Sequence, residues 1–276
     1  MHSHLEISQD EYAKISTYIR ENYGISLSEK KRTFIISRLG NIVKTKGFNT
    51  INDYFEHIQE DKTGNTVIEM INKLTTNYTY FYREHKHFEY MKNIVLPSLV
   101  KKEALSKDMR IWSAGCATGE EPYTLQMIIK DVLRESYASW NTDILATDIS
   151  TNALAKAREG VYPNEAIDKM PPEWKNKYFQ RLDEDNSIIK NEIKSRIIFK
   201  RFNLMDPFPF KRRLHVIFCR NVMIYFDAET KNKLVDKFYE MMEPGGYLFI
   251  GHAESIDRNA SRYNYIQPAV YRKEEA

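Results

Sequence analysis

The segment His215–Phe226, with the sequence HVIFCRNVMIYF, changes character within a few residues. Its first five residues are mostly apolar and β-prone, which is typical of a strand buried on both faces. Arg220 and Asn221 follow at once, and Tyr225 comes shortly after them. Polar donors at the carboxyl end of a buried strand lie where open α/β sheets place ligand contacts. The segment predicts an α/β sheet with a binding loop after this strand, although a loop that only satisfies its own backbone has the same pattern.

The chain from about residue 107 onward alternates β-prone and amphipathic helical segments. Such alternation predicts a mostly parallel sheet with helices packed on it. The expected strands are Arg110–Ser113, Thr142–Ala146, Ile197–Phe202, His215–Cys219 and Tyr247–Ile250, and the expected helices are Glu121–Leu133, Thr151–Arg158 and Ala228–Met242. Pro244-Gly245-Gly246 is expected to form the turn after the last helix, and Ile266–Tyr271 to form a final edge strand.

The alternation breaks at about residues 161–195. Met170-Pro171-Pro172 interrupts the pattern, and an aromatic segment, Trp174–Phe179, precedes a polar one, Asp183–Ser187. Consecutive prolines end helices and strands, so the regular alternation does not continue through this segment. We therefore expect an inserted subdomain here, on the edge of the sheet.

The first 85 residues show helical patterns and no strand signals. Ser8 and Glu11 have the spacing of a capping box that opens a helix through Arg20, and Ser28 is the next candidate cap. The later expected helices are Lys30–Lys46, which Gly47 ends, Asn52–Gln59 and Val67–Leu74. We therefore predict an N-terminal helical domain, residues 1–85, and an α/β domain, residues 86–276.

The helix expected at Lys30–Lys46 is amphipathic. Its apolar side carries Phe34, Ile35, Ile36, Leu39, Ile42 and Val43, and the other half carries Lys30, Lys31, Arg38 and Lys44. These charges are typical of a solvated face, and they also fit a docking surface for an acidic helical partner.

Composition limits the possible functions. The chain has 276 residues, 42% hydrophobic and 29% charged, as in ordinary globular proteins. Its formal net charge of +3 is too small to indicate nucleic-acid binding. It contains no run as apolar as a membrane span or the core of a signal peptide. Cys116 and Cys219 lie in segments expected to be buried, so we expect reduced thiols in a cytoplasmic protein.

A glycine loop, Ala114–Gly119, joins the first strand to its helix. Its spacing differs from the dinucleotide fingerprint, and tight strand–helix turns also occur without ligands. Glu120 and Glu121 follow at the helix start, where a dinucleotide's pyrophosphate would bind. Carboxylates there repel phosphate and attract ammonium. S-adenosylmethionine (SAM) has an ammonium, a sulfonium and no phosphate, so the loop favours SAM over NAD. Either Glu120 or Glu121 could make the contact with the cofactor.

Asp148 stands after the second expected strand. An acid at this place hydrogen-bonds ribose hydroxyls in nucleotide-binding α/β folds, although an aspartate can instead cap the next helix. Because Ser150 is better placed as that cap, we predict that Asp148 binds the ribose of the cofactor.

His85 and His87 suggest a metal site at first sight. Side chains at i and i+2 of a helix point apart, and no third ligand is near in sequence. We therefore expect no metal.

Three segments together resemble a known family. They are TNYTYFYRE (Thr76–Glu84), WSAGCATGEEPYTL (Trp112–Leu125) and FCRNVMIYF (Phe218–Phe226). Their order and spacing are similar to those of the CheR-type chemotaxis receptor methyltransferases, over nearly the whole chain. The resemblance implies a Rossmann-like SAM-dependent methyltransferase domain with an N-terminal all-helical domain and a small inserted antiparallel β-subdomain. It also implies an enzyme that esterifies glutamates of chemoreceptors with SAM and leaves S-adenosylhomocysteine.

The resemblance also implies the site residues. Those for the cofactor are Asn77, Thr79, Arg83, Glu120, Asp148, Asn203, Leu204, Asn221 and Val222. Arg83 and Tyr225 are the candidate catalytic residues. The Arg83 guanidinium matches two carboxylate oxygens, and the Tyr225 ring suits orientation of the acceptor or contact with the sulfonium. The cofactor is then expected between the two domains.

A glutamate acceptor needs no general base, because its carboxyl, with a pKa of about 4.3, is ionised at neutral pH. The sequence shows no obvious base near Tyr225, so positioning and desolvation must supply the rate. The alternatives are a methyltransferase of RNA or of a small molecule, and a receptor-binding adaptor without turnover.

The implied partner is the cytoplasmic helical bundle of chemoreceptors, which the basic helix at residues 30–46 would contact. Some members of the family bind a receptor's C-terminal peptide through a glycine-bearing loop of the inserted subdomain. This chain has no glycine between Val161 and Pro244. We therefore do not expect peptide binding, and we expect a monomer without direct membrane insertion.

Overall fold

The computed structural model describes residues 7–168, 170–257 and 261–275, apart from the side chain of Lys31. The chain divides into two compact units. The first comprises the chain up to Asn77 together with Tyr225–Lys231, and the second comprises Tyr78–Ile224 and Asn232–Ala276. The domain limits drawn at residues 85 and 86 stay predictions, because compactness does not show which segments fold alone.

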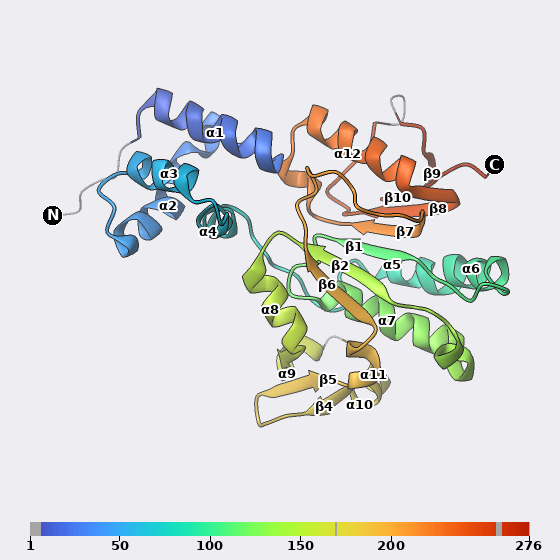
Figure 1. Ribbon diagram of the computed structural model, residues 1–276. Helices are drawn as coiled ribbons and strands as arrows, with labels where there is room; N and C mark the ends of the chain where they lie inside the picture. The colour runs from blue at the N-terminus through green and yellow to red at the C-terminus, as the bar shows by residue number, and fades with distance from the viewer. Residues whose placement is uncertain (1–6, 169, 258–260, 276) are drawn as a thin grey trace. The chain divides into compact units, whose positions relative to one another are not determined.

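The first unit is built from helices (Figure 1). Their bounds are Gln9–Tyr23 (α1), Arg32–Lys46 (α2), Ile51–Glu60 (α3) and Asn65–Leu74 (α4). The predicted capping box is present at α1, because the Ser8 hydroxyl accepts the Glu11 amide N–H and the Glu11 carboxylate accepts the Ser8 N–H. Ser28 precedes a 3-10 turn, Glu29–Lys31, and makes no side-chain cap there.

The amphipathic pattern predicted for α2 is partly wrong. Ile35, Leu39, Ile42 and Val43 are buried, whereas Phe34 is 45% exposed. The Phe34 ring lies on the outer side of the helix, where its centroid is 4.9 Å from the Arg38 guanidinium carbon. Lys30, Arg38 and Lys44 are exposed, and the Lys31 side chain lies outside the described part of the structure.

The second unit contains a mostly parallel sheet, as predicted. Among the described residues seven strands have the order β6-β2-β1-β7-β8-β10-β9. Their bounds are Ile111–Ala114 (β1), Ile144–Asp148 (β2), Ile197–Arg201 (β6), Leu214–Cys219 (β7), Met242–Ile250 (β8), Asn264–Gln267 (β9) and Val270–Arg272 (β10). Neighbours from β6 to β8 are parallel, and β10 and β9 are antiparallel.

Helices cover both faces of this sheet (Figure 1). On one face the Trp112 ring packs against Phe208 and against Phe238 of α12. On the other face Ile111 joins an apolar cluster with residues of α5, α6 and α7. These helices are His85–Tyr90 (α5), Leu96–Lys102 (α6), Glu120–Leu133 (α7), Thr151–Glu159 (α8) and Ala228–Met241 (α12). None of the described helices has the length and apolar character to cross a membrane.

Two predictions for the last part of the chain are wrong. Pro244-Gly245-Gly246 forms no turn but belongs to β8, which follows α12 directly. Glycine is needed there because a Cβ on Gly246 would lie 2.9 Å from the His215 carbonyl oxygen. The single strand predicted at Ile266–Tyr271 is the antiparallel pair β9 and β10. Pro268, which has no amide N–H for strand pairing, lies in the turn between them.

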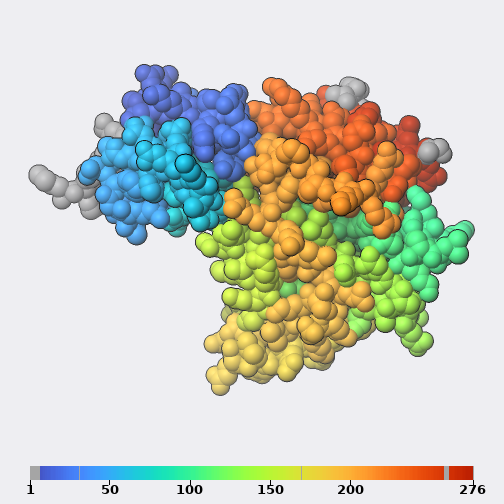
Figure 2. Space-filling model, in the orientation of Figure 1, coloured from blue at the N-terminus to red at the C-terminus, as the bar shows by residue number. Residues whose placement is uncertain are grey.

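The predicted small inserted antiparallel β-subdomain is confirmed, whereas its limits at about residues 161–195 stay a prediction. Its strands pair antiparallel in the order β3-β5-β4, and Figure 2 shows this segment in yellow as a lobe of the second unit. Its elements are Val161–Pro163 (β3), Asn164–Ile167 (α9), Pro172–Tyr178 (α10), Phe179–Arg181 (β4), Asn186–Ile189 (β5) and Asn191–Lys194 (α11).

Candidate active site

The strand order of the sheet reverses at β1, which lies between β2 and β7. Ligands of open α/β sheets bind at such a point, outside the carboxyl ends of the strands. The loops after β1 and β7 touch here, since a Cβ added to Gly115 would lie 2.3 Å from Cγ2 of Val222. Gly115 also has a φ of +82°, which favours glycine. The structure thus brings the predicted glycine loop and Val222 together.

Asp148 connects the end of β2 to the glycine loop. Its Oδ2 accepts the Ala117 amide N–H and its Oδ1 accepts the Ser150 N–H, both at 2.8 Å. The Ser150 hydroxyl caps α8 by accepting the Ala153 N–H, as predicted. Burial raises the pKa of the Asp148 carboxyl, against the effect of these amide hydrogen bonds. No cationic side chain of the described residues forms an ion pair with it.

The two glutamates at the start of α7 have different partners. Glu120 is 7% exposed, and its Oε2 accepts the Thr118 hydroxyl at 2.7 Å. Burial raises the pKa of the Glu120 carboxyl. Glu121 accepts the Ser113 hydroxyl at 2.7 Å and pairs with the Arg220 guanidinium at 2.9 Å. Within the described chain Glu120 has no such ion pair, and its contact with the cofactor stays a prediction.

Arg220 is the centre of a buried ion network that the sequence did not reveal. Its side chain is 2% exposed and contacts Glu121 and, at 3.0 Å, Oε2 of Glu84. The guanidinium also donates to the Arg83 carbonyl and lies over the Phe88 ring. Burial opposes ionisation of Glu84, but the charge and hydrogen bond of Arg220 hold the pKa of Glu84 below its usual value.

Asn221 is held from two sides. It has a φ of +60°, and its Nδ2 lies 3.4 Å from Oε1 of Glu84. Its amide N–H donates to Glu254 at 3.0 Å. A Cβ on Gly251 would lie 2.4 Å from Asn221 Nδ2, so glycine is needed for this approach. Sequence reasoning missed Glu84 and Glu254. Glu254 could have been found from its position, because a polar residue soon after a buried strand is a candidate for the site. Arg220 was noticed in the same way after β7.

The other predicted residues of the second unit are Thr79, Arg83, Asn203 and Leu204. Nη1 of the half-buried Arg83 donates to the Tyr78 carbonyl at 2.8 Å. Asn203 lies in the turn after β6, where its Oδ1 accepts the Met205 N–H at 3.1 Å. Leu204 is buried and Thr79 half-buried. The contacts of these residues with the cofactor stay predictions.

Asn77 and Tyr225 belong to the first unit. The Tyr225 hydroxyl accepts the Thr76 N–H at 3.2 Å, and its carbonyl accepts the Ser26 N–H at 2.7 Å. Tyr225 thereby joins the N-terminal helices. The expectation that these residues and the glycine loop share one cofactor stays a prediction.

Glu84, His87 and His252 come together in the fold, with one potential ligand atom from each within 4.8 Å of the others. His87 is 1% exposed, and burial lowers its pKa to about 3. The Glu84 oxygen that faces His87 Nδ1 at 3.4 Å also pairs with Arg220. Because this guanidinium already supplies the positive charge, we assign no metal to the cluster, and the expectation of no metal site stays a prediction.

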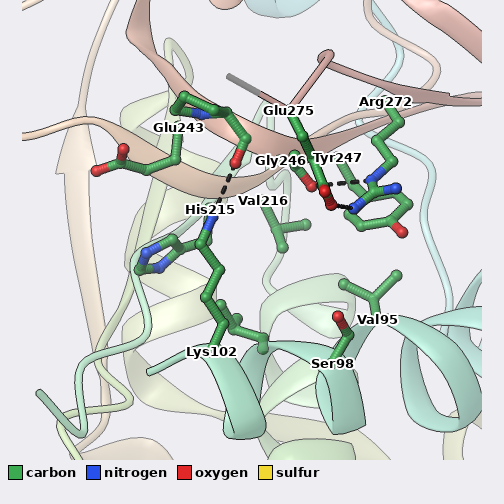
Figure 3. A pocket seen from close by; sticks show the side chains of 13 residues that line it. Val95, Ser98, Lys102, His215, Val216, Glu243, Gly246, Tyr247, Arg272 and Glu275 are labelled. Carbon is green, nitrogen blue, oxygen red and sulfur yellow. Dashed lines mark hydrogen bonds and ion pairs between the residues drawn. The ribbon is translucent and has the colours of Figure 1, made fainter. Parts of the chain in front are cut away.

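A pocket of about 390 Å³, including its open mouth, lies at the other end of the parallel strands (Figure 3). It is lined by the start of β7 and β8 and by α6. Figure 3 shows Lys102, whose ammonium donates to the Pro244 carbonyl at 2.8 Å, and the ion pair between Arg272 and Glu275. The pocket is thus remote from the glycine loop and is not the switch-point site.

The sequence matches two family descriptions in chain order. They are "CheR methyltransferase, all-alpha domain" at residues 10–75 and "CheR methyltransferase, SAM binding domain" at residues 77–271. The chain belongs to the CheR methyltransferase family. The predicted family and SAM-dependent methyltransferase activity are thereby confirmed.

Relatives of this CheR methyltransferase match it over nearly its whole length. It is 44% identical over 273 residues to the "Chemotaxis protein methyltransferase" of Borreliella burgdorferi, across 98% of this chain and 96% of that protein. It is 34% identical to the "Probable chemotaxis protein methyltransferase" of Rhizobium etli, across 92% of this chain and 96% of the relative. It is 32% identical to the "Chemotaxis protein methyltransferase" of Escherichia coli, across 98% and 93%.

The charges of the site fit SAM, the cofactor of this CheR methyltransferase. Glu120 and Asp148 are buried anions, and neither forms an ion pair with a cationic side chain of the described residues. A positively charged ligand near them would balance this charge, whereas phosphates would add to it. The preference for SAM over NAD predicted from the glycine loop agrees with this arrangement.

Proposed function

We propose that this CheR methyltransferase transfers the methyl group of SAM to glutamate carboxylates of bacterial chemoreceptors, with S-adenosylhomocysteine as the second product. The observation that carries the proposal is the pair of buried carboxylates, Glu120 and Asp148, beside the contact of Gly115 with Val222. Similarity at full length to proteins named chemotaxis methyltransferases supports the choice of acceptor.

Each cofactor residue is assigned by the chemistry that it offers. Glu120 attracts the ammonium group of SAM, because Glu121 is already paired with Arg220. Asp148 accepts the ribose hydroxyls through lone pairs left after its two amide hydrogen bonds. The adenine and the methionine portion contact Asn203, Leu204, Asn221 and Val222, and Asn77, Thr79 and Arg83 complete the pocket.

When bound, SAM supplies an electrophilic methyl group on its sulfonium. The acceptor glutamate is ionised at neutral pH, so no residue of the chain has to remove a proton. We assign Arg83 to hold one oxygen of the acceptor, through guanidinium nitrogens other than the one bonded to Tyr78, and to leave the second oxygen for the methyl group. Tyr225 orients the acceptor. Positioning and exclusion of water then supply the rate.

The receptor surface in this proposal is the acidic helical bundle of the chemoreceptor. The exposed Arg38 and Lys44 of α2 are the described charges that would contact it. We do not propose binding of a receptor's C-terminal peptide, because no glycine stands between Val161 and Pro244. We propose a monomer that acts without membrane insertion.

The test is methyl transfer from methyl-labelled SAM to a cytoplasmic receptor fragment, followed by alkali. Methyl esters release labelled methanol, whereas methylated amines and RNA bases do not. We expect alkali-released methanol, and none from a fragment whose methylated glutamates are replaced by alanine. Alkali-stable label, or label in added RNA only, would contradict the glutamate acceptor. SAM binding without any transfer to receptor would favour the adaptor.

A further inference from the structure

Several backbone segments meet at the carboxylate of Glu254, which is 8% exposed. Its Oε2 accepts the amide N–H of Asn221 at 3.0 Å and that of Gly251 at 2.6 Å. Its Oε1 accepts the Ile224 N–H at 3.1 Å. One side chain thus holds both ends of the loop Asn221–Ile224 and joins this loop to the end of β8.

This carboxylate is in an environment that disfavours its charge. Burial raises the pKa of Glu254, against the effect of the surrounding amide N–H groups. Those amides are its hydrogen-bond partners, and in the described part of the chain it forms no ion pair with a lysine, arginine or histidine. A buried charge adds little net stability compared with an apolar side chain of similar size. Stability alone is therefore a weak reason for a glutamate here.

The loop that Glu254 holds needs a fixed backbone. Asn221 has a φ of +60°, a conformation that residues other than glycine adopt only at some cost. The side chain of Asn221 reaches Glu84 on the other side, and Val222 closes against Gly115. A small shift of the loop therefore moves two predicted cofactor residues at once.

We infer that Glu254 is a positioning residue for methyl transfer. It acts through Asn221 and Val222, whose backbone it fixes in the conformation that receives SAM. Three N–H groups converge on two oxygens of one anion, so a neutral glutamine cannot replace it, because the glutamine NH₂ would face an amide donor. The inference rests on the proposed function, which assigns Asn221 and Val222 to the cofactor.

The test is a double-mutant cycle on the full chain, with SAM affinity measured by titration calorimetry. We expect Asn221→Ala and Glu254→Gln each to raise the Kd for SAM about tenfold, and the double variant to bind about as well as either single one. Glu243 is the control, since it pairs with Arg110 at the opposite end of β8. Glu243→Gln should lower the melting temperature and leave the Kd unchanged, which separates positioning from general stability.

Gly251→Ala tests the same inference without changing charge, because the new Cβ would displace Asn221. It should also raise the Kd about tenfold, and an unchanged Kd in this variant would overturn the inference even if Glu254→Gln does not fold. A folded Glu254→Gln variant with wild-type SAM affinity overturns the positioning role, and so does a double variant whose loss is the product of the single losses. If Asn221→Ala alone binds SAM normally, the cofactor assignment of the loop fails and the inference fails with it.

Discussion

The two ends of the parallel strands treat buried charge in opposite ways. At the amino ends Asp108 pairs with Arg110 and Arg212, and hydrogen bonds from Arg110 and Asn141 outweigh burial and hold its pKa below the usual value. At the carboxyl ends burial raises the pKa of Glu120, Asp148 and Glu254, and none of them has an ion-pair partner among the described residues. Glu84 and Glu121 at the carboxyl ends are paired with Arg220, so the two ends differ in these three acids, which have no cationic partner among the described residues.

This difference shows how to separate structural charges from functional ones. Removal of one partner of an ion pair that is buried within the fold leaves the other charge without compensation and should lower the free energy of unfolding. A carboxyl that is buried without a cation is neutralised by a proton, balanced by a cationic ligand, or held by hydrogen-bond donors for its geometry. The pocket in Figure 3 lies at the amino ends of the strands, which is why its volume alone does not identify the active site.

The largest expected effect comes from exchanging one acid at each end. Asp148→Asn removes the charge at the switch point and should weaken SAM binding by about 1.5–3 kcal/mol, roughly 10- to 150-fold in Kd, because charge-assisted hydrogen bonds are lost. Asp108→Asn should instead lower the free energy of unfolding by about 1–3 kcal/mol and leave SAM affinity unchanged. Calorimetry and denaturant unfolding on both variants measure this, and equal effects on both properties would remove the distinction.

The amino ends of the strands should also be sensitive to acid. Burial lowers the pKa of His215 to about 4, among Arg110, Glu103, Glu243 and Lys102. The unfolded chain takes up this proton near pH 6.5 while the folded chain stays neutral, so stability falls as pH drops from about 6.5 to about 4. Titration of His215 changes the free energy of unfolding by at most about 1.4 kcal/mol per pH unit.

Urea unfolding between pH 7 and pH 4.5 checks this slope. His215→Asn should reduce the loss of stability with acid, whereas His57→Asn, on the surface of α3, should keep the wild-type profile. A wild-type profile for His215→Asn would show that His215 titrates alike in both states.

A smaller effect is expected at the carboxyl ends of the strands, where it should distinguish residues that bind SAM from residues that act in methyl transfer. Arg83→Ala and Tyr225→Phe should lower kcat about tenfold, or about 1.4 kcal/mol, with little change in the Kd for SAM. The reason is that Tyr225 is assigned to the acceptor and Arg83 chiefly to the acceptor, although Arg83 also lines the proposed cofactor pocket, whereas Asp148 is assigned to the cofactor alone. Arg181→Ala, in the exposed part of β4, is the control. If Arg83→Ala abolishes SAM binding and leaves little further loss in kcat, the role of Arg83 is in the cofactor pocket.

The smallest effect is expected where charges are exposed. Arg38→Glu combined with Lys44→Glu should raise the KM for receptor by a few fold and leave SAM affinity unchanged, because exposed pairs contribute about 1 kcal/mol or less. Added salt should weaken the wild type more than this variant, since screening acts over about 8–10 Å. Lys14→Glu with Lys62→Glu makes the same charge change elsewhere on the helical unit. Identical receptor kinetics for both pairs would leave α2 as a solvated face.

Local patterns predicted most of the elements and the glycine loop between β1 and α7, because those signals lie within a few residues. The capping box at Ser8, the cap at Ser150 and the strands before Gly115 and Asn221 were read correctly. The helical periodicity of α2 wrongly placed Phe34 on the buried side. The spacing of apolar residues does not show that this ring lies outside, against the Arg38 guanidinium.

The charge network could not be predicted from the sequence. Arg220, after β7, meets Glu121, after β1, and Glu84, before α5, only in the folded chain, and Glu254, after β8, reaches the neighbouring loop at Asn221 in the same way. Sequence reasoning found no third metal ligand near His85 and His87, although Glu84 lies three residues before His87. Only the fold brings His252 to Glu84 and His87.

The most direct test of the contrast between the two ends is amide hydrogen exchange of the full chain with and without saturating SAM. We predict slower exchange on SAM binding at residues 115–121, 148–150 and 220–224, at the carboxyl ends of the strands. We predict no change at residues 98–110 and 242–247, around the pocket at the amino ends. Protection confined to the pocket, with the glycine loop unchanged, would contradict the account.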